Sequence, residues 1–449
     1  MVLPLHNCSY CPSPSTEFCY TCDRHLCGQH ALKAFHECPT DGDAYNTAYA
    51  QTSNNNFNMQ ISSIDKSRIL NNAIKTGRVG SVTVKDCHLD IPVSRDVALM
   101  GGKHLHLPLT FKNSDKWLVR LALQGGSASP QELLIQEMRS EVATLTALES
   151  VGMRIAKARS RCVIPRGARS PYFFLEWLDG KASFMDGTLG QQKSWITEIA
   201  KDFVKLEELA YSAIGCLTFT SDDGSDMFVG PMVEPTLCGQ DSKGRLSQLG
   251  PFENPQEFRI AQVEQVLSLI EGGHKYSENA LDAYLVHLEV IELIKVLYPK
   301  QQGPHLFYIR HADDKGDHWL FRGDCFLGTI DWEWAYTTTK EEAFAAPLAF
   351  IDIGAFYDGQ NNLSDLENAF AGAFDLLQRP DLAMLVRGGK KYQRLPFVIG
   401  TDFFDLPNLF LAFRQLVLGQ DSKPTFGEWK KEAWEKYKDH SFLASQTMS

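Results

Sequence analysis

Closely spaced cysteines and histidines fill the start of the chain and limit its local fold more than any other feature. Six of the 11 cysteines lie between Cys8 and Cys38. The candidate ligands form four pairs: Cys8 and Cys11, Cys19 and Cys22, Cys27 and His30, His36 and Cys38. Two side chains from one tight turn can reach the same ion, at about 2.3 Å for sulfur and about 2.0–2.1 Å for nitrogen. Eight ligands are enough for two closed tetrahedral zinc sites, which are structural rather than catalytic.

The size of this segment supports a metal-dependent fold. About 40 residues cannot bury enough apolar surface to fold alone, so metal binding would supply the folding free energy. The alternative is a coincidental cysteine-rich terminus, but four correctly spaced pairs favour the metal. The other five cysteines are scattered, as small buried apolar residues usually are.

The ligand pattern resembles the AN-one-type zinc finger, whose ending H-x5-H-x-C is matched by His30, His36 and Cys38. The gap between Cys11 and Cys19 is short for that family and is more similar to a B-box. Both families interleave their ligands. The resemblance therefore implies two ligand sets: Cys8, Cys11, Cys27 and His30 on one ion, and Cys19, Cys22, His36 and Cys38 on the other. Protein–protein contact is the role expected of such a finger.

The charge balance disfavours nucleic acid as a partner. The net charge of the 449 residues is −11, which leaves no broad basic surface for a phosphate backbone. Within residues 1–40 the only Lys or Arg side chains are Arg24 and Lys33. We find neither a secretory signal nor an apolar run that would span a membrane, which predicts residence in the cytoplasm or nucleus, where thiols stay reduced.

The next segment, residues 41–80, predicts a linker after the finger of residues 1–40. It is polar and includes three consecutive asparagines, Asn54 to Asn56. Apolar residues between Ile61 and Ile74 recur at helical spacing and favour one short amphipathic helix there.

The remainder of the chain predicts a two-lobed α+β fold, with a strand-rich lobe over 81–177 and a helical lobe over 178–449. Strands are expected at 82–84, 107–111, 117–123, 171–177, 306–310, 319–321 and 328–332. Helices are expected at 131–151, 190–215, 256–298 and over most of 341–445. The Gly-, Pro- and Asp-rich stretch 219–255 predicts a long loop or hairpin, which would form a substrate cap together with the helices that follow it.

A second group of polar residues lies where the expected strands return. Two apolar segments flank a loop that contains His311, Asp313 and Lys315, and a later strand ends in Asp331-Trp332-Glu333. Phosphoryl transfer needs one carboxylate near the acceptor hydroxyl and a second group that holds Mg²⁺ on the nucleotide phosphates. The pattern therefore favours a phosphotransferase, whereas the alternative is a polar loop in an unrelated α/β protein.

These residues resemble the H-x-D-x-x-x-x-N loop and the I-D-W-E strand of the aminoglycoside phosphotransferase and choline kinase group, in a variant carried by many fungal members. The resemblance covers roughly residues 95–415 and implies a protein-kinase-like fold that uses ATP and Mg²⁺ to phosphorylate a small hydroxyl- or amine-bearing molecule. By position, Asp313 is the catalytic base and Asp331 the principal metal ligand. His311 would brace the loop, and Lys315 would stabilise charge on the transferred phosphate.

Two departures from the family pattern affect the nucleotide. His318 replaces the metal-binding Asn, and a neutral imidazole is a poorer ligand for Mg²⁺ than for Mn²⁺. Arg120 stands where the family has the nucleotide-binding Lys, with Glu141 as its expected helix partner. Glu176 belongs to a segment that resembles the interlobe hinge, although an ordinary buried strand followed by a turn would look the same.

Two functions therefore remain open. One is an ATP-dependent kinase that acts on a small molecule. The other is a pseudokinase, a nucleotide-binding scaffold whose finger recruits protein partners. The acidic residues Asp222, Asp223 and Asp226 lie in the cap stretch and would suit a cationic acceptor, but surface loops are often acidic.

Overall fold

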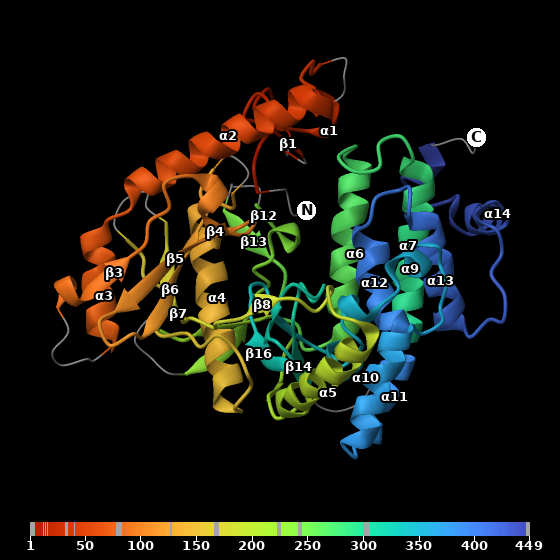
Figure 1. Ribbon diagram of the computed structural model, residues 1–449. Helices are drawn as coiled ribbons and strands as arrows, with labels where there is room; N and C mark the ends of the chain where they lie inside the picture. The colour runs from red at the N-terminus through yellow and green to blue at the C-terminus, as the bar shows by residue number, and fades with distance from the viewer. Residues whose placement is uncertain are drawn as a thin grey trace.

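The structure is a computed structural model. It describes residues 5–11, 13, 15, 17–31, 35–39, 41–77, 83–125, 128–165, 170–221, 226–240, 245–299 and 305–445. Figure 1 shows a strand-rich part on the left, a helical part on the right, and the N-terminal elements above them.

The N-terminal part begins with a small hairpin and continues into helices. The hairpin consists of β1 (Glu17–Cys19) and β2 (Arg24–Leu26), and α1 (Gly28–Ala31) follows it. Residues expected to form a linker instead contain α2 (Gly42–Ser63). The short amphipathic helix expected around Ile61–Ile74 is present as α3 (Lys66–Gly77). Phe57, Ile69 and Leu70 of these helices are buried against the sheet of the first lobe, and this packing stabilises helices whose sequence is largely polar.

The first lobe, called here the sheet lobe, is an antiparallel five-stranded sheet with one long helix. Its strands are β3 (Cys87–Leu89), β4 (Leu99–Met100), β5 (His104–Phe111), β6 (Lys116–Ala122) and β7 (Tyr172–Glu176), in the order β3-β5-β6-β7 with β4 beside β5. The helix is α4 (Gln131–Ser150), as expected. The expected strand at 82–84 is wrong for its described residues, because Val84–Asp86 form a 3-10 turn; Val82 lies outside the described residues.

Side-chain alternation along this sheet separates its core face from its cleft face. Leu105, Leu107 and Val119 point to α2 and α3 and are fully buried. The intervening positions, His106 and Arg120, face the other way and stand opposite each other across β5 and β6. The sheet therefore directs basic and imidazole groups toward the helical half of the molecule.

The second lobe, called here the helical lobe, contains short strands and ten helices in its described part. The strands are β8 (Lys181–Ala182), β9 (Ala210–Tyr211), β10 (Cys216–Phe219), β11 (Met227–Gly230), β12 (Cys238–Gln240), β13 (Leu246–Gln248), β14 (Phe307–Arg310), β15 (Trp319–Arg322), β16 (Cys325–Thr329) and β17 (Tyr336–Thr338). The helices of more than five residues are α5 (Leu189–Leu206), α6 (Pro255–Glu271), α7 (Ala280–Leu297), α10 (Asp365–Leu376), α11 (Pro380–Gly388), α12 (Lys390–Gly400), α13 (Leu406–Leu418) and α14 (Phe426–Tyr437). Two shorter helices are α8 (Lys340–Ala343) and α9 (Ile353–Tyr357).

The α+β class and the two lobes agree with the expectation, but several boundaries differ. The helix expected at 190–215 ends at Leu206, because the chain then enters β9 and pairs with β14. The stretch 256–298 is helical as expected and contains two helices, which are separated at Gly272 and Gly273, where Gly273 adopts a positive φ of 70°. The stretch 219–255 includes the hairpins β10–β11 and β12–β13. Asp226 is exposed, whereas Asp222 and Asp223 lie outside the described residues.

None of the helices in the described part of the chain combines the length and the apolar character that crossing a membrane requires.

A buried acidic residue anchors the strands that carry the polar loop. Glu342 accepts hydrogen bonds from Arg310 at 2.9 Å, Tyr336 at 2.7 Å and Thr338 at 2.8 Å, and it also pairs with Arg259. Burial alone would raise the pKa of Glu342, but the two arginines outweigh burial and hold the pKa at about 2. Because Arg310 directly precedes His311, this cluster fixes the start of the loop.

Replacement of Glu342 by glutamine is expected to destabilise the fold by roughly 3–5 kcal/mol, because two buried arginines lose their counter-charge. Since the folded-state pKa lies below the ordinary value of 4.5, the carboxylate stabilises the fold above about pH 4.5 and loses this effect as the pH falls toward 2. Urea unfolding at pH 7, 4 and 3 should therefore show a smaller loss of stability at low pH in Glu342→Gln than in the wild type. The exposed neighbour provides the control, Glu341→Gln, which should behave as wild type; equal pH profiles for all three proteins would contradict this account.

Candidate functional site

A cleft of about 260 Å³ lies between the sheet lobe and the helical lobe. Its apolar walls come from both lobes and include Leu118, Leu145, Leu175 and Ile330. Four residues singled out from the sequence line it: Arg120, Glu141, Glu176 and Asp331. An apolar cavity with a few converging polar groups is the usual form of a small-molecule site.

Arg120 is the centre of the polar side of the cleft. It is 3% exposed and bonds Glu141 on α4 through Nε at 2.9 Å and Asp331 through Nη2 at 2.6 Å. Its Nη1 lies 2.9 Å from Nε2 of His106, the residue opposite it on β5. The expected pairing of Arg120 with the helix glutamate is therefore present, and the same guanidinium also connects the two lobes.

Asp331 follows β16 and has a backbone conformation that is uncommon for a residue with a side chain. Its φ is +65°, in the left-handed region that costs most residues energy, and such strain is often found at functional sites. Its side chain remains 39% exposed. Burial alone would raise the pKa of Asp331, but Arg120 outweighs burial and lowers the pKa below its usual value. Asp331 is therefore a carboxylate at neutral pH.

His311 connects the polar loop to the segment that carries Asp331. Its Nδ1 accepts a hydrogen bond from the backbone N–H of Asp313 at 3.2 Å. Its Nε2 donates to the carbonyl of Ile330 at 3.0 Å, one residue before Asp331. Both bonds agree with a single neutral tautomer that is protonated on Nε2. The bracing geometry expected of His311 is present, and it links the backbone at Asp313 to the residue before Asp331.

Lys315 lies between the side chains of Asp313 and Asp317. Its Nζ donates to Asp313 at 2.8 Å and lies 3.7 Å from Asp317. The bond to Asp313 is the largest cause of a raised pKa for Lys315, and the charge of Asp331 adds to the shift. Asp313 and Lys315 do not line the cavity itself but lie on the exposed loop beside it, with side chains 38% and 57% exposed.

The position of His318 differs from the expectation. The sequence places it at the metal-binding position of the family loop, but its side chain is buried beneath that loop, where its Nδ1 accepts a hydrogen bond from Gly316 N at 3.2 Å. Its ring lies 4.4 Å from the ring of His311, and it does not line the cleft. Burial lowers its pKa well below the usual value, so the imidazole is neutral. His318 supports the loop from below in this arrangement.

Three further residues that line the cleft, Glu333, His104 and His106, were given no role from the sequence. Glu333 ends the I-D-W-E motif, and its Oε2 accepts no hydrogen bond within the described part of the chain, although His104 Nδ1 lies 3.2 Å away. Burial raises the pKa of Glu333 to about 7, and the charge of Asp331 adds to this shift against the opposing effect of Arg120. Strand alternation along β5 was the available signal for His104 and His106.

Glu176 lies at the end of β7, where the chain leaves the sheet lobe. Its carboxylate pairs with Arg159 at 3.1 Å, and the residue lines the cleft. Gly101 and Gly102, in the turn between β4 and β5, also line the cleft. The position of Glu176 at the end of β7 agrees with both interpretations of the sequence, an interlobe hinge and an ordinary strand followed by a turn.

The cysteines and histidines near the N-terminus form two groups. The first contains Cys8, Cys11, Cys27 and His30, and the second contains Cys19, Cys22, His36 and Cys38. Within each group the candidate ligand atoms all lie within 4.8 Å of one another. This is the interleaved grouping that the family resemblance implied, and it arises because the β1–β2 hairpin carries Cys19 at the end of β1 and leads into Cys27 after β2.

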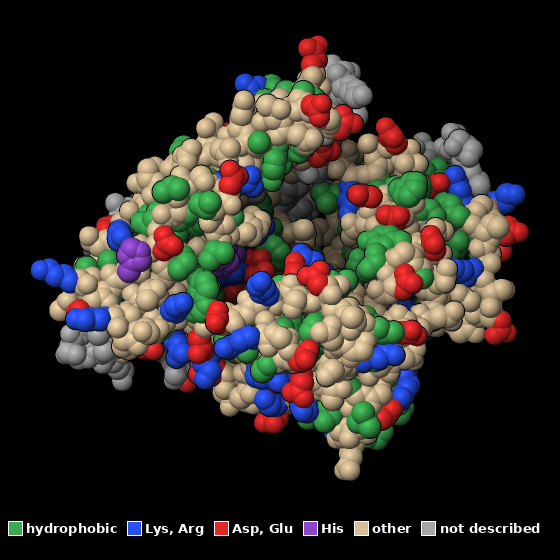
Figure 2. Space-filling view, in the orientation of Figure 1, with side chains coloured by type: hydrophobic (Ala, Val, Ile, Leu, Met, Phe, Trp, Pro, Cys, Tyr) green, Lys and Arg blue, Asp and Glu red, His purple; other side chains and the backbone are tan. Residues whose placement is uncertain are grey.

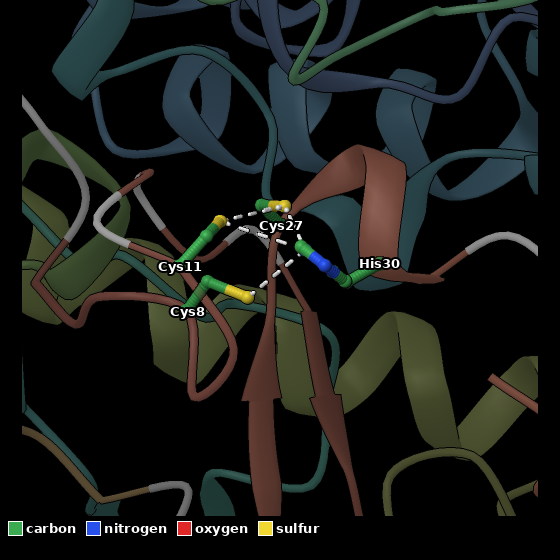
Figure 3. A group of neighbouring side chains, drawn as sticks. All are labelled: Cys8, Cys11, Cys27 and His30. Carbon is green, nitrogen blue, oxygen red and sulfur yellow. Dashed lines mark hydrogen bonds between the residues drawn. The ribbon is translucent and has the colours of Figure 1, made fainter. Parts of the chain in front are cut away.

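The first group has the dimensions of a zinc site. In Figure 3 its side chains point toward one another from the N-terminal loop, the end of β2 and α1. Cys11 Sγ lies 3.8 Å from Cys27 Sγ, and His30 Nδ1 lies 3.5 Å from Cys8 Sγ. Tetrahedral ligands with bonds of about 2.3 Å stand about 3.8 Å apart. In the second group, Cys22 Sγ lies 3.5 Å from His36 Nε2. Both groups fit a metal ion of this kind.

Comparison with protein-family models found no match, and comparison with curated proteins found none either. Among solved structures, ADP-bound aminoglycoside phosphotransferase APH(2'')-Ib is 11% identical with a TM-score of 0.43, covering 79% of this chain and 99% of that chain. The streptomycin–ATP complex of APH(2")-IIa has 11% identity and a TM-score of 0.41, with coverages of 80% and 97%. An ethanolamine kinase from Plasmodium vivax has 12% identity and a TM-score of 0.40, with coverages of 87% and 93%. At these scores the similarities carry no conclusion about activity or substrate.

Proposed function

We propose that the chain is an ATP-dependent phosphotransferase that acts on a small molecule bearing a hydroxyl or amine. The observation that carries this proposal is the pair of bonds made by His311, to Asp313 N and to the carbonyl of Ile330. They join the loop of one candidate acidic residue to the segment of the other, at the open edge of a cleft. Phosphoryl transfer depends on such positioning more than on covalent chemistry of the protein.

Each polar group then has a separate role. Asp313 would accept the proton of the acceptor, since it is exposed at the edge of the cleft and held by Lys315 at 2.8 Å. Lys315 would stabilise the negative charge of the transferred group. Arg120 would bind nucleotide phosphate from the cleft wall, while Glu141 orients its guanidinium. The apolar walls of the cleft would hold the adenine base of the nucleotide.

The acidic residues beside Arg120 fit a divalent cation. The carboxylates of Asp331 and Glu333 supply hard oxygen donors of the type that Mg²⁺ prefers, and Glu333 Oε2 accepts no hydrogen bond within the described residues. When bound with ATP, Mg²⁺ would neutralise the charge of the ATP phosphates and orient the γ-phosphoryl group. Glu333, rather than the buried His318, would then supply the second protein ligand. Mn²⁺ would serve with the same two carboxylates.

Replacement of Arg120 by lysine is expected to weaken nucleotide binding about tenfold. A lysine keeps the charge but cannot bond Glu141, His106 and Asp331 at once, and one charge-assisted hydrogen bond contributes about 1.5–3 kcal/mol. Calorimetric titration with ATP and Mg²⁺ measures the change. Arg387→Lys, a change on a side chain of α11 that is 48% exposed and pairs with Asp375 away from the cleft lining, is the matched control and should bind as wild type. Equal affinities for wild type and Arg120→Lys would remove Arg120 from the proposed nucleotide site.

A second candidate function is a nucleotide-binding scaffold without catalysis. It is favoured by one observation, the 2.6 Å pair between Arg120 and Asp331, which occupies an oxygen that a metal would need. A scaffold of this kind would bind ATP but show no hydrolysis above that of Asp313→Asn. The phosphotransferase proposal predicts hydrolysis that depends on Mg²⁺ or Mn²⁺ and on both acidic residues.

We further propose that two zinc ions stabilise the N-terminal segment, one at each Cys/His group. Reduced thiols are required for this ligation, which is consistent with residence in the cytoplasm or nucleus. Both sites are closed by four protein ligands, so the ions would be structural.

A further inference from the structure

The metal module, defined as the described residues between 5 and 39, contacts the helix that lies along the sheet lobe. Tyr20, between Cys19 and Cys22, accepts a hydrogen bond at its carbonyl from Thr52 of α2 at 2.9 Å, and its ring packs on Tyr49 at 4.8 Å. Helix α2 is in turn fixed to the sheet lobe by Gln60, which donates to the carbonyl of Ala122 at 3.0 Å. The second metal group is therefore attached to the sheet lobe.

The start of the metal module contacts the first turn of α4 and the β12–β13 hairpin. Leu5, 9% exposed, packs in a core with Leu133 of α4 and Cys238 of β12. Its carbonyl accepts a hydrogen bond from Gln240 at 2.8 Å, and His6 Nε2 donates to the carbonyl of Ala128, just before α4, at 3.2 Å. Leu5 lies three residues before Cys8, so the first metal group holds this anchor in place.

The other side of the first metal group meets the helical lobe. Gly28 stands between Cys27 and His30, and a Cβ at Gly28 would lie only 2.7 Å from the carbonyl oxygen of Gly273, in the turn after α6. The module and this turn also form opposite walls of a cavity of about 630 Å³. Figure 2 shows the surface hollowed between the N-terminal elements and the helices on the right.

We propose that the metal module is an internal clamp that joins the two lobes and fixes the position of α4. Its described contacts reach the sheet lobe through α2, α4 directly, and the helical lobe through the turn at Gly273. The partner of this finger is then its own chain. The clamp requires the two metal sites proposed above, but it does not require phosphoryl transfer.

The clamp acts on the nucleotide cleft through α4. Leu133 and Glu141 lie on the same helix, about 12 Å apart along its axis. Glu141 holds Arg120, and Arg120 holds Asp331. A loosened α4 would therefore move the guanidinium that lines the cleft, although none of the eight Cys and His residues of the metal module lines the cleft. By linkage, nucleotide binding should in turn slow the loss of zinc.

The decisive variant adds a wedge at Gly28 without removing a metal ligand. Gly28→Val places side-chain atoms against Gly273, whereas the neighbouring Gln29 is exposed and Gln29→Val serves as the matched control. Zinc per chain, measured by elemental analysis, should stay at two in both variants. Hydrogen exchange should become at least about tenfold faster at 273–277 and in the first turn of α4 in Gly28→Val only. ATP affinity should fall about fivefold or more in Gly28→Val.

Identical exchange in the two variants would overturn the clamp. If Gly28→Val loses zinc, Thr52→Val and Gln240→Leu test the same idea from outside the module, since each removes one docking bond and leaves every module residue unchanged. Both variants should speed hydrogen exchange in α1 and the β1–β2 hairpin. Unchanged exchange there would overturn the clamp proposal. If the chain binds no nucleotide at all, the proposed phosphotransferase function is wrong. The hydrogen-exchange measurements would still show whether the metal module joins the two lobes.

Discussion

Replacing Asp313 with asparagine is expected to reduce metal-dependent ATP turnover by a factor of about 10²–10⁴, the range typical for loss of a general base. Asparagine keeps the shape of the side chain but cannot accept the proton. Turnover is measured as phosphate release, with water as the acceptor. Asp317→Asn is the matched control, because Asp317 lies on the same loop and also pairs with Lys315, but is 63% exposed.

The fold of the Asp313→Asn protein should remain intact. Asp313 is 38% exposed, and its side chain pairs with the exposed Lys315, so the lost ion pair contributes at most about 1 kcal/mol to stability. ATP affinity should stay within about threefold of wild type, since Asp313 does not line the cleft. Wild-type turnover in Asp313→Asn, or an equal loss in Asp317→Asn, would show that Asp313 is not the base.

Replacing Cys27 with serine is expected to remove at least one of two zinc ions per chain and to unfold the N-terminal segment. Cys27 is 2% exposed and lies 3.2 Å from His30 Nδ1, so a serine hydroxyl leaves the site without one thiolate ligand. Structural zinc in small fingers contributes about 10–16 kcal/mol to folding. Elemental analysis measures the zinc ions per chain, and limited proteolysis measures whether residues 1–40 remain folded.

The control for this experiment is Cys325→Ser, because Cys325 is exposed and belongs to neither metal group. It should retain two ions and a protected N-terminus. Two ions in Cys27→Ser, or none in the wild type, would contradict the assignment of the first group. Cys22→Ser extends the test to the second group.

The local parts of the structure could be predicted from sequence because short spacings have few solutions. Pairs such as Cys8 and Cys11 come from single tight turns, and α4 has a regular apolar stripe, so both follow from neighbouring residues. Helix α2 was missed for the opposite reason: its sequence is polar, and only Phe57 and Gln60 are buried within it. Its stability depends on packing against a sheet that begins more than 20 residues later.

The sequence predicted which residues are candidates for the site better than it predicted where their side chains point. Motif spacing located Asp313, Asp331 and Arg120, and alternation along β6 accounts for why Arg120 faces the cleft. Spacing along a loop does not determine where a side chain points, and Gly316, with a φ of +107°, turns the chain so that His318 lies beneath the loop. The docking of Leu5 on Gln240, 235 residues away, has no local sequence signal.

The most direct test of the proposed nucleotide site is a calorimetric titration of the purified chain with ATP in the presence of Mg²⁺ and, separately, Mn²⁺. We expect one nucleotide per chain with either ion, and at least about tenfold weaker binding in Asp331→Asn, which loses the carboxylate proposed to hold the ion. Absence of binding with both ions, or the same affinity in Asp331→Asn, would contradict the assignment of this cleft to ATP.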